Sequence, residues 1–173
     1  LTKPSAGFDD PKLHRETAEV FALLTGLRAA IDELSDHCTP EGLAAVLETL
    51  KRVEDASIKI GNFTFLTLAV DANNEDARAY YDRVNDMDIE RRQTFSALSR
   101  LLGTIDRLDA FIAGQPVLEE HAFLLRKLKQ SASHVIDPAL EPTVLRMQTT
   151  GGSAWSRLRN DLDANLMIPF EKD

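Results

Sequence analysis

The histidines are the first residues to test for catalysis, because imidazole is the commonest general base and a common metal ligand. They lie at His14, His37, His121 and His134. No two of them have the i, i+4 spacing that would place both rings on one helical face to bind a metal ion. The run Glu119-Glu120-His121 sets an acid beside a base and is the least favoured hypothesis, a small helical enzyme. We interpret His121 instead as a core-boundary residue and His134 as a loop residue.

The acidic run from Asp71 to Asp76 is the second candidate, because it superficially resembles the start of a calcium loop. Such a loop requires glycine at its sixth position and a bidentate glutamate at its twelfth. This chain has Asp76 and Asp82 at those positions. The run is therefore predicted to be a turn between helices with acidic capping residues.

The single cysteine and the remaining motifs add no reaction. Cys38 has no activating partner in sequence, so an inert thiol is expected. Asn62-Phe63-Thr64 fits a glycosylation sequon but falls within a helical pattern, so it is interpreted as a chance match. The sequence contains no phosphate-binding glycine loop, no Cys-x-x-Cys pair and no Gly-x-Ser-x-Gly elbow. We thus predict no catalytic, cofactor-binding or metal-binding residue in this chain.

Composition narrows the class of protein further. The chain has 173 residues and a net charge of −8, which argues against a nucleic-acid binder. Basic residues do cluster at Arg91-Arg92 and along Arg126-Lys127-Lys129, where solvated helix faces are expected. A single cysteine favours a reducing compartment. The sequence has no apolar run long enough to predict a membrane span and no amino-terminal signal segment that would predict export. A cytoplasmic location is expected.

The elements that would position these residues are predicted to be helices, because apolar residues recur at spacings of three and four. After an extended lead-in over residues 1–10, one helix should begin at Pro11, capped by Asp9 or Asp10, and end near Cys38. A second should run from Pro40, capped by Thr39, to about residue 70, with a break or close contact possible at Gly61. The first three helices are each expected to contain about 25 to 35 residues, which corresponds to a length of roughly 40 to 50 Å.

The third long helix should open at Glu75 and end or kink near Gly103. Gly114-Gln115-Pro116 predicts a break, followed by a fourth helix that includes Leu118 and Leu128. Shorter helices are expected over 138–149 and 153–167, the last one capped by Ser153. We therefore predict an all-α fold: an antiparallel bundle of three long helices plus shorter carboxy-terminal helices, with one domain over residues 11–167.

The carboxy-terminal third carries a resemblance to a known family. The segments concerned are His134-Val135-Ile136-Asp137-Pro138-Ala139-Leu140-Glu141, then Thr150-Gly151-Gly152-Ser153-Ala154-Trp155 with Leu158, and finally Ile168-Pro169-Phe170. In order and spacing they are similar to the end of the amino-terminal helical domain of oligoendopeptidase F-type, thimet oligopeptidase-related, zinc metallopeptidases. A weaker similarity covers residues 65–84, so the resemblance spans roughly residues 41–170.

The resemblance implies a function for the parent protein rather than for this chain. Family members hydrolyse short peptides with zinc held by a His-Glu-x-x-His helix and a further glutamate, and the glutamate within the motif acts as general base. That motif is absent from this sequence, so the zinc and the catalytic domain are expected downstream in the same polypeptide. By resemblance this chain is the non-catalytic domain that covers the substrate channel, with residues 168–173 the start of a truncated extended segment. The alternative is a stand-alone helical interaction or sensor module.

One structural expectation depends directly on this interpretation. Trp155 heads an apolar stripe that continues through Leu158, Leu162 and Leu166. Such a stripe predicts that Trp155 is largely buried and that Trp155→Ala costs about 3 to 5 kcal/mol of stability. Residues 168–173 are expected to be poorly anchored.

Overall fold

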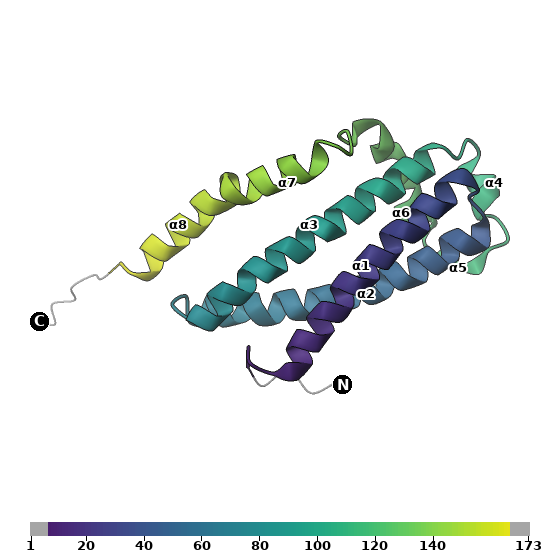
Figure 1. The fold of residues 1–173 in the computed structure, drawn as a ribbon. Coiled ribbons are helices and arrows are strands. Elements are labelled where there is room, and N and C mark those ends of the chain that lie inside the picture. Colours follow the sequence, from purple (N-terminus) through teal and green to yellow (C-terminus); the bar gives the residue numbers. More distant parts are fainter. Residues whose placement is uncertain (1–6, 167–173) are drawn as a thin grey trace, which may run out of the picture.

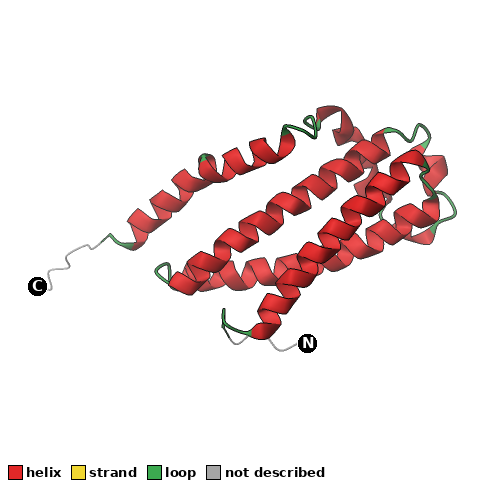
Figure 2. Ribbon diagram, viewed as in Figure 1, coloured by secondary structure: helices red, strands yellow, loops and turns green. Residues whose placement is uncertain are grey.

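Three long helices form the main body of the protein. The computed structural model describes residues 7–166, and in this range the chain contains helices, turns and loops but no strand (Figure 2). The long helices are α1 (Pro11–Asp36), α2 (Pro40–Val70) and α3 (Glu75–Gly103), packed against one another in all three pairings (Figure 1). Short connections make sequential neighbours antiparallel, so the predicted all-α bundle is confirmed.

Each long helix begins at a side-chain cap; those of α1 and α2 are residues that the sequence predicted, whereas the cap of α3 is Asn74 and not one of the acidic residues expected there. The Asp10 carboxylate accepts a hydrogen bond from the backbone N–H of residue 12, and Thr39 Oγ1 accepts one from the N–H of residue 42 at 3.1 Å. Asn74 Oδ1 accepts from the N–H of residue 77 at 2.9 Å. Pro11 and Pro40 occupy first-turn positions, where a backbone donor is not missed.

The core lies between the apolar faces of these three helices and is extended by the shorter ones. Its fully buried large side chains include Leu13, Leu24, Ile31, Leu43, Leu98, Leu102, Leu118 and Leu125. Most polar groups within it are paired: the Thr17 and Tyr80 hydroxyls share a hydrogen bond, and Thr64 Oγ1 donates to the carbonyl of residue 60. Ser57 Oγ is buried without a hydrogen-bond partner among the described residues. Most periodic apolar residues of the first two helices are thus buried inside the chain, whereas Phe65, Leu66 and Val70 at the end of α2 are exposed.

The amino-terminal lead-in differs from the prediction where it can be described. Residues 7–9 form a turn rather than an extended segment, and the N–H of Asp10 donates to the carbonyl of Gly7. The Phe8 ring lies 4.9 Å from that of Phe63 and 5.4 Å from that of Tyr80, between ring centroids. This aromatic contact gains more than an extended, solvated segment would.

Two of the glycines marked as possible breaks behave differently. α2 continues through Gly61 without a break, and an added Cβ there would meet Val84 at 3.9 Å, an ordinary contact distance, so the expected close helix contact is not found either. Gly114 adopts a positive φ of 86° in the turn after α4, which glycine tolerates without the steric cost of a side chain.

The second half of the chain is a series of short helices. They are α4 (Leu108–Ile112), α5 (Pro116–Glu120), α6 (Ala122–Ser131), a 3₁₀ turn (Ala132–His134), α7 (Glu141–Thr150) and α8 (Gly152–Ala164). The predicted fourth helix is therefore divided at His121, and His134 ends a 3₁₀ turn instead of lying in a loop. Ser153 does not cap α8: Gly151 occupies the cap position without a side-chain hydrogen bond, and Ser153 lies within the first turn. The expectations for residues 168–173 lie outside the described residues.

None of the helices in the described range combines the length and apolar character required to cross a bilayer.

Candidate functional site beside α8

α7 is held against α3 by an ion pair whose carboxylate is buried. The Arg100 guanidinium donates to Glu141 Oε2 at 3.3 and 3.4 Å and to the carbonyl of Ile136 at 3.3 Å. Glu141 is only 5% exposed, whereas Arg100 retains contact with solvent. Because a buried carboxylate is costly without a partner, this pair determines where α7 leaves the bundle.

α8 is joined to α3 by ion pairs that span a gap. Arg78 Nη2 lies 2.7 Å from Asp161 Oδ1, and Arg157 Nη1 lies 3.4 Å from Asp82 Oδ1. Arg78 comes before Asp82 along α3, but its partner Asp161 comes after Arg157 along α8. The two helices are therefore antiparallel. Figure 1 shows α7 and α8 one after the other alongside α3. All four side chains are at least 40% exposed, so the pairs contribute about 0 to 1 kcal/mol each.

A cleft of about 790 Å³ lies between α8 and the bundle. One wall comes from the end of α2, the turn after it and the start of α3, and it consists mainly of Phe65, Leu68, Ala69, Ala72, Ala79 and Tyr81. The opposite wall comes from α8 and is polar: Ser153, Ser156 and Asn160. The two cross-cleft ion pairs, Arg78–Asp161 and Arg157–Asp82, belong to the same lining. The cleft thus places an apolar surface opposite hydrogen-bonding groups.

The burial of Trp155 was wrongly predicted, because its side chain is 73% exposed. At 100° per residue, Arg157 and Asp161 lie about 200° and 240° around the helix from Trp155. Since these charged residues pair with α3, the face that carries Trp155 points away from the bundle. No residue of α8 is buried.

The outward face of α8 is an unpartnered apolar stripe. It consists of Trp155, Leu158, Leu162 and, just after the helix, Leu166, all of them exposed. Met147 on α7 is also exposed. α8 therefore turns its polar face toward the protein and its apolar face outward, the reverse of an ordinary surface helix.

The residues proposed for a small helical enzyme are not assembled into an acid–base pair. His121 Nδ1 lies 2.9 Å from the carbonyl of Val117 in its own helical turn. Glu119 Oε1 instead accepts a hydrogen bond from the N–H of Gly114 at 2.9 Å. His14 lies on α1, where its ring is 5.8 Å from the Tyr80 ring. Within residues 7–166 no three histidine, cysteine or acidic side chains are grouped so that they could hold a metal ion.

The acidic run forms the predicted turn between α2 and α3, in which Asn74 rather than an acid caps α3. Asp71 Oδ1 accepts from the N–H of Asn73 at 3.1 Å within the turn between α2 and α3. Cys38 is half-buried, and desolvation by burial raises the pKa of its thiol. A raised pKa reduces the thiolate fraction, so this group is a poor nucleophile at neutral pH.

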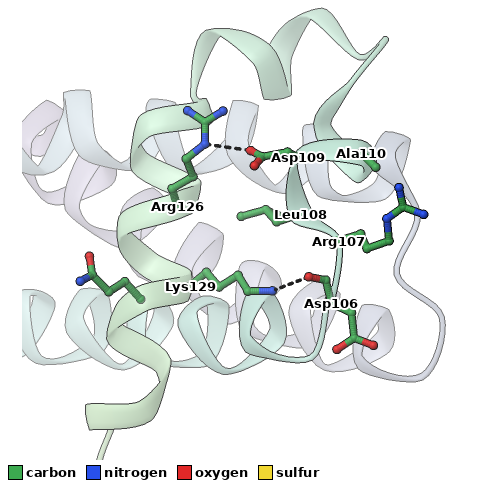
Figure 3. A pocket seen from close by; sticks show the side chains of 8 residues that line it. Asp106, Arg107, Leu108, Asp109, Ala110, Arg126 and Lys129 are labelled. Carbon is green, nitrogen blue, oxygen red and sulfur yellow. Dashed lines mark hydrogen bonds and ion pairs between the residues drawn. The ribbon is translucent and has the colours of Figure 1, made fainter.

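A second hollow, of about 540 Å³, lies between α6 and the segment around α4 (Figure 3). Figure 3 shows Arg126 directed toward Asp109, at 2.8 Å, and Lys129 directed toward the backbone of Asp106, at 3.2 Å. Lys129 also donates to the carbonyl of Ile105. Arg126 and Lys129 thus already bind protein acceptors, as the two arginines of the cleft beside α8 do, while Arg107 also lines this hollow.

Sequence reasoning did not identify the cleft, although one signal for it was present. Arg78 and Asp82 are spaced i, i+4, and so are Arg157 and Asp161. Each pair alone is typical of a solvated helix face. Read together, the reciprocal pattern on two helices would have suggested antiparallel pairing.

Comparison with known proteins supports the resemblance for the second half of the chain. A family model described as oligopeptidase F, for the amino-terminal domain of M3 peptidases, matches residues 104–167. No curated protein and no solved structure matches this chain. The matched range covers α4 to α8, and the weaker similarity over residues 65–84 lies outside it. Residues 104–167, which include one wall of the cleft and the whole apolar stripe, are thus similar to the amino-terminal domain of oligopeptidase F, as the sequence indicated.

Proposed function

We propose that this chain is a non-catalytic amino-terminal domain of an oligoendopeptidase F-like zinc metallopeptidase, and that it covers the access route of short peptide substrates. The proposal rests chiefly on the family match over residues 104–167. That match ends three residues after α8, a helix whose apolar face is turned away from its own bundle.

The apolar stripe of α8 supports a partner in the same polypeptide. Exposed apolar surface rimmed by polar residues is typical of an interaction site, because its burial releases ordered water. We infer that the downstream catalytic domain covers Trp155 and Leu162. In this arrangement the α1–α3 bundle is a rigid wall beside the active site, and α7 and α8 join it to the catalytic domain.

The zinc chemistry belongs to the downstream domain in this proposal. Zinc would polarise the scissile carbonyl and lower the pKa of a bound water, with a glutamate of that domain as general base. The described residues of this chain provide no fitting ligand set. We therefore assign them positioning and exclusion only: they bound the entry route and select peptides that can reach the metal.

The reading frame and the activity of its complete product test this proposal. We expect the frame to continue beyond Asp173 into a His-Glu-x-x-His motif. The complete product should cleave short internally quenched peptides in a chelator-sensitive manner and leave folded casein-sized substrates intact. The chain of residues 1–173 should cleave neither. A frame without that motif, or stoichiometric zinc and peptidase activity in residues 1–173, would refute the proposal.

A stand-alone helical interaction or sensor module is the second candidate. The outward stripe of α8 favours it equally, because an apolar helix face fits a separate protein as well as a downstream domain. A start codon just before Leu1 and a stop codon just after Asp173 would favour this alternative.

A further inference from the structure

We propose that the cleft between α8 and the α2–α3 wall binds a short peptide with free termini. The proposed function suggests the ligand class, while the site itself follows from the lining of the cleft. Its volume of about 790 Å³ falls within the range of small-ligand sites, roughly 300 to 1,000 Å³.

The apolar wall accommodates a side chain. Phe65 and Leu68 from α2 and Tyr81 from α3 provide its large surfaces, with Phe65 64% exposed. Ala69 and Ala79 leave space between them because their side chains are single methyl groups. An aliphatic or aromatic side chain placed there would cover apolar surface that water now contacts.

The polar wall suits a peptide backbone. Every peptide unit carries a donor and an acceptor that need partners when they leave water. Ser156 Oγ donates to the carbonyl of Gly152 at 3.3 Å and retains its acceptor capacity. The Asn160 side chain, which can both donate and accept, makes no hydrogen bond to another of the residues described. α8 therefore offers hydrogen-bonding side chains on its wall of the cleft, whereas the part of the opposite wall formed by α2 is apolar.

The charges match a zwitterion. Two arginines and two aspartates line the cleft, so their charges cancel and the cleft does not repel a ligand of zero net charge. The two pairs are one helical turn apart, about 6 Å for four residues. Two extended residues span roughly 7 Å, a similar length. Because solvent-exposed ion pairs are weak, the ammonium group of a peptide can pair with Asp161 and its carboxylate with Arg157.

A titration followed by NMR tests the site in the chain as it exists. The ¹⁵N-labelled chain of residues 1–173 is titrated with Leu-Phe, and separately with N-acetyl-Leu-Phe amide. We expect Leu-Phe to shift amide resonances in residues 65–82 and 153–161, and the capped peptide to bind at least about tenfold more weakly. The indole N–H of Trp155, on the opposite face of α8, should not shift.

A matched pair of tryptophan variants provides the control. Ala69→Trp fills the cleft from an exposed position on α2, whereas Ala45→Trp adds the same side chain at an exposed position of α2 outside it. Binding should be lost in the first and retained in the second, with equal helicity by far-UV circular dichroism. If Ala69→Trp perturbs the fold, Asn160→Leu on exposed α8 replaces it and should weaken binding at least fivefold.

Several results would overturn the proposal. They are an absence of shifts at millimolar peptide, shifts centred on Trp155, equal binding of the capped peptide, or binding unaffected by both cleft variants. The outcome is separable from that of the proposed function. Peptide binding by residues 1–173 requires neither zinc nor hydrolysis, and zinc-dependent hydrolysis by a complete product does not require this cleft.

Discussion

Replacement of Trp155 by alanine distinguishes the observed orientation of α8 from the one its sequence suggested. A fully buried aromatic side chain covers roughly 150 to 250 Å². Trp155 is 73% exposed, so about a quarter of that area, on the order of 50 Å², is covered. At about 25 cal/mol per Å² the loss is ~1.3 kcal/mol. Alanine regains about 0.5 kcal/mol of helix propensity, so the net loss should be about 1 kcal/mol.

Urea unfolding followed by far-UV circular dichroism measures this difference. The matched control is Leu102→Ala, because Leu102 is 0% exposed in the core and its truncation should cost about 2 to 5 kcal/mol. The dependence of unfolding free energy on urea should keep the same slope in both variants. A loss of 3 kcal/mol or more for Trp155→Ala would show that its stripe is buried inside the chain, and would refute the outward orientation of α8.

Further predictions concern α7, the start of α2 and the cysteine. Arg100→Met leaves the buried carboxylate of Glu141 without its cation and should cost about 2 to 3 kcal/mol by urea unfolding, less than for a fully buried pair because Arg100 is partly exposed. Adding Glu141→Gln to that variant should restore part of the loss, whereas an additive second loss would contradict the pairing. Thr39→Ala removes the cap of α2 and should cost about 1 kcal/mol, while an unchanged urea midpoint would show that the cap is dispensable. Burial raises the pKa of Cys38, so its thiolate is scarcer in the folded chain at any pH below that pKa. Alkylation by iodoacetamide at pH 8 should therefore be slower than in urea, and equal rates would refute the effect.

Local sequence determined the long helices of this protein. Asp10 and Thr39 cap the first two, each followed by proline, and the Asp71–Asn74 turn separates the second from the third. These signals act between residues two to four positions apart, so they are readable without knowledge of distant contacts. Apolar spacing likewise predicted that the long helices pack together, and residues such as Leu24 and Leu98 are fully buried, because in a bundle of three long helices the partners of such a stripe lie in the same chain.

Only the tertiary structure decided which face of α8 meets the bundle. The sequence contains both the apolar stripe headed by Trp155 and the charged pair Arg157 and Asp161, and periodicity favoured burial of the stripe. The pair instead meets Arg78 and Asp82, whose matching charges lie on an antiparallel helix about 80 residues earlier. An amphipathic pattern indicates that a helix has an apolar face. It does not indicate whether that face packs against the same domain or against another one. For that reason both the cleft and the outward orientation of the stripe follow from the position of α8 beside α3, which the sequence alone does not give.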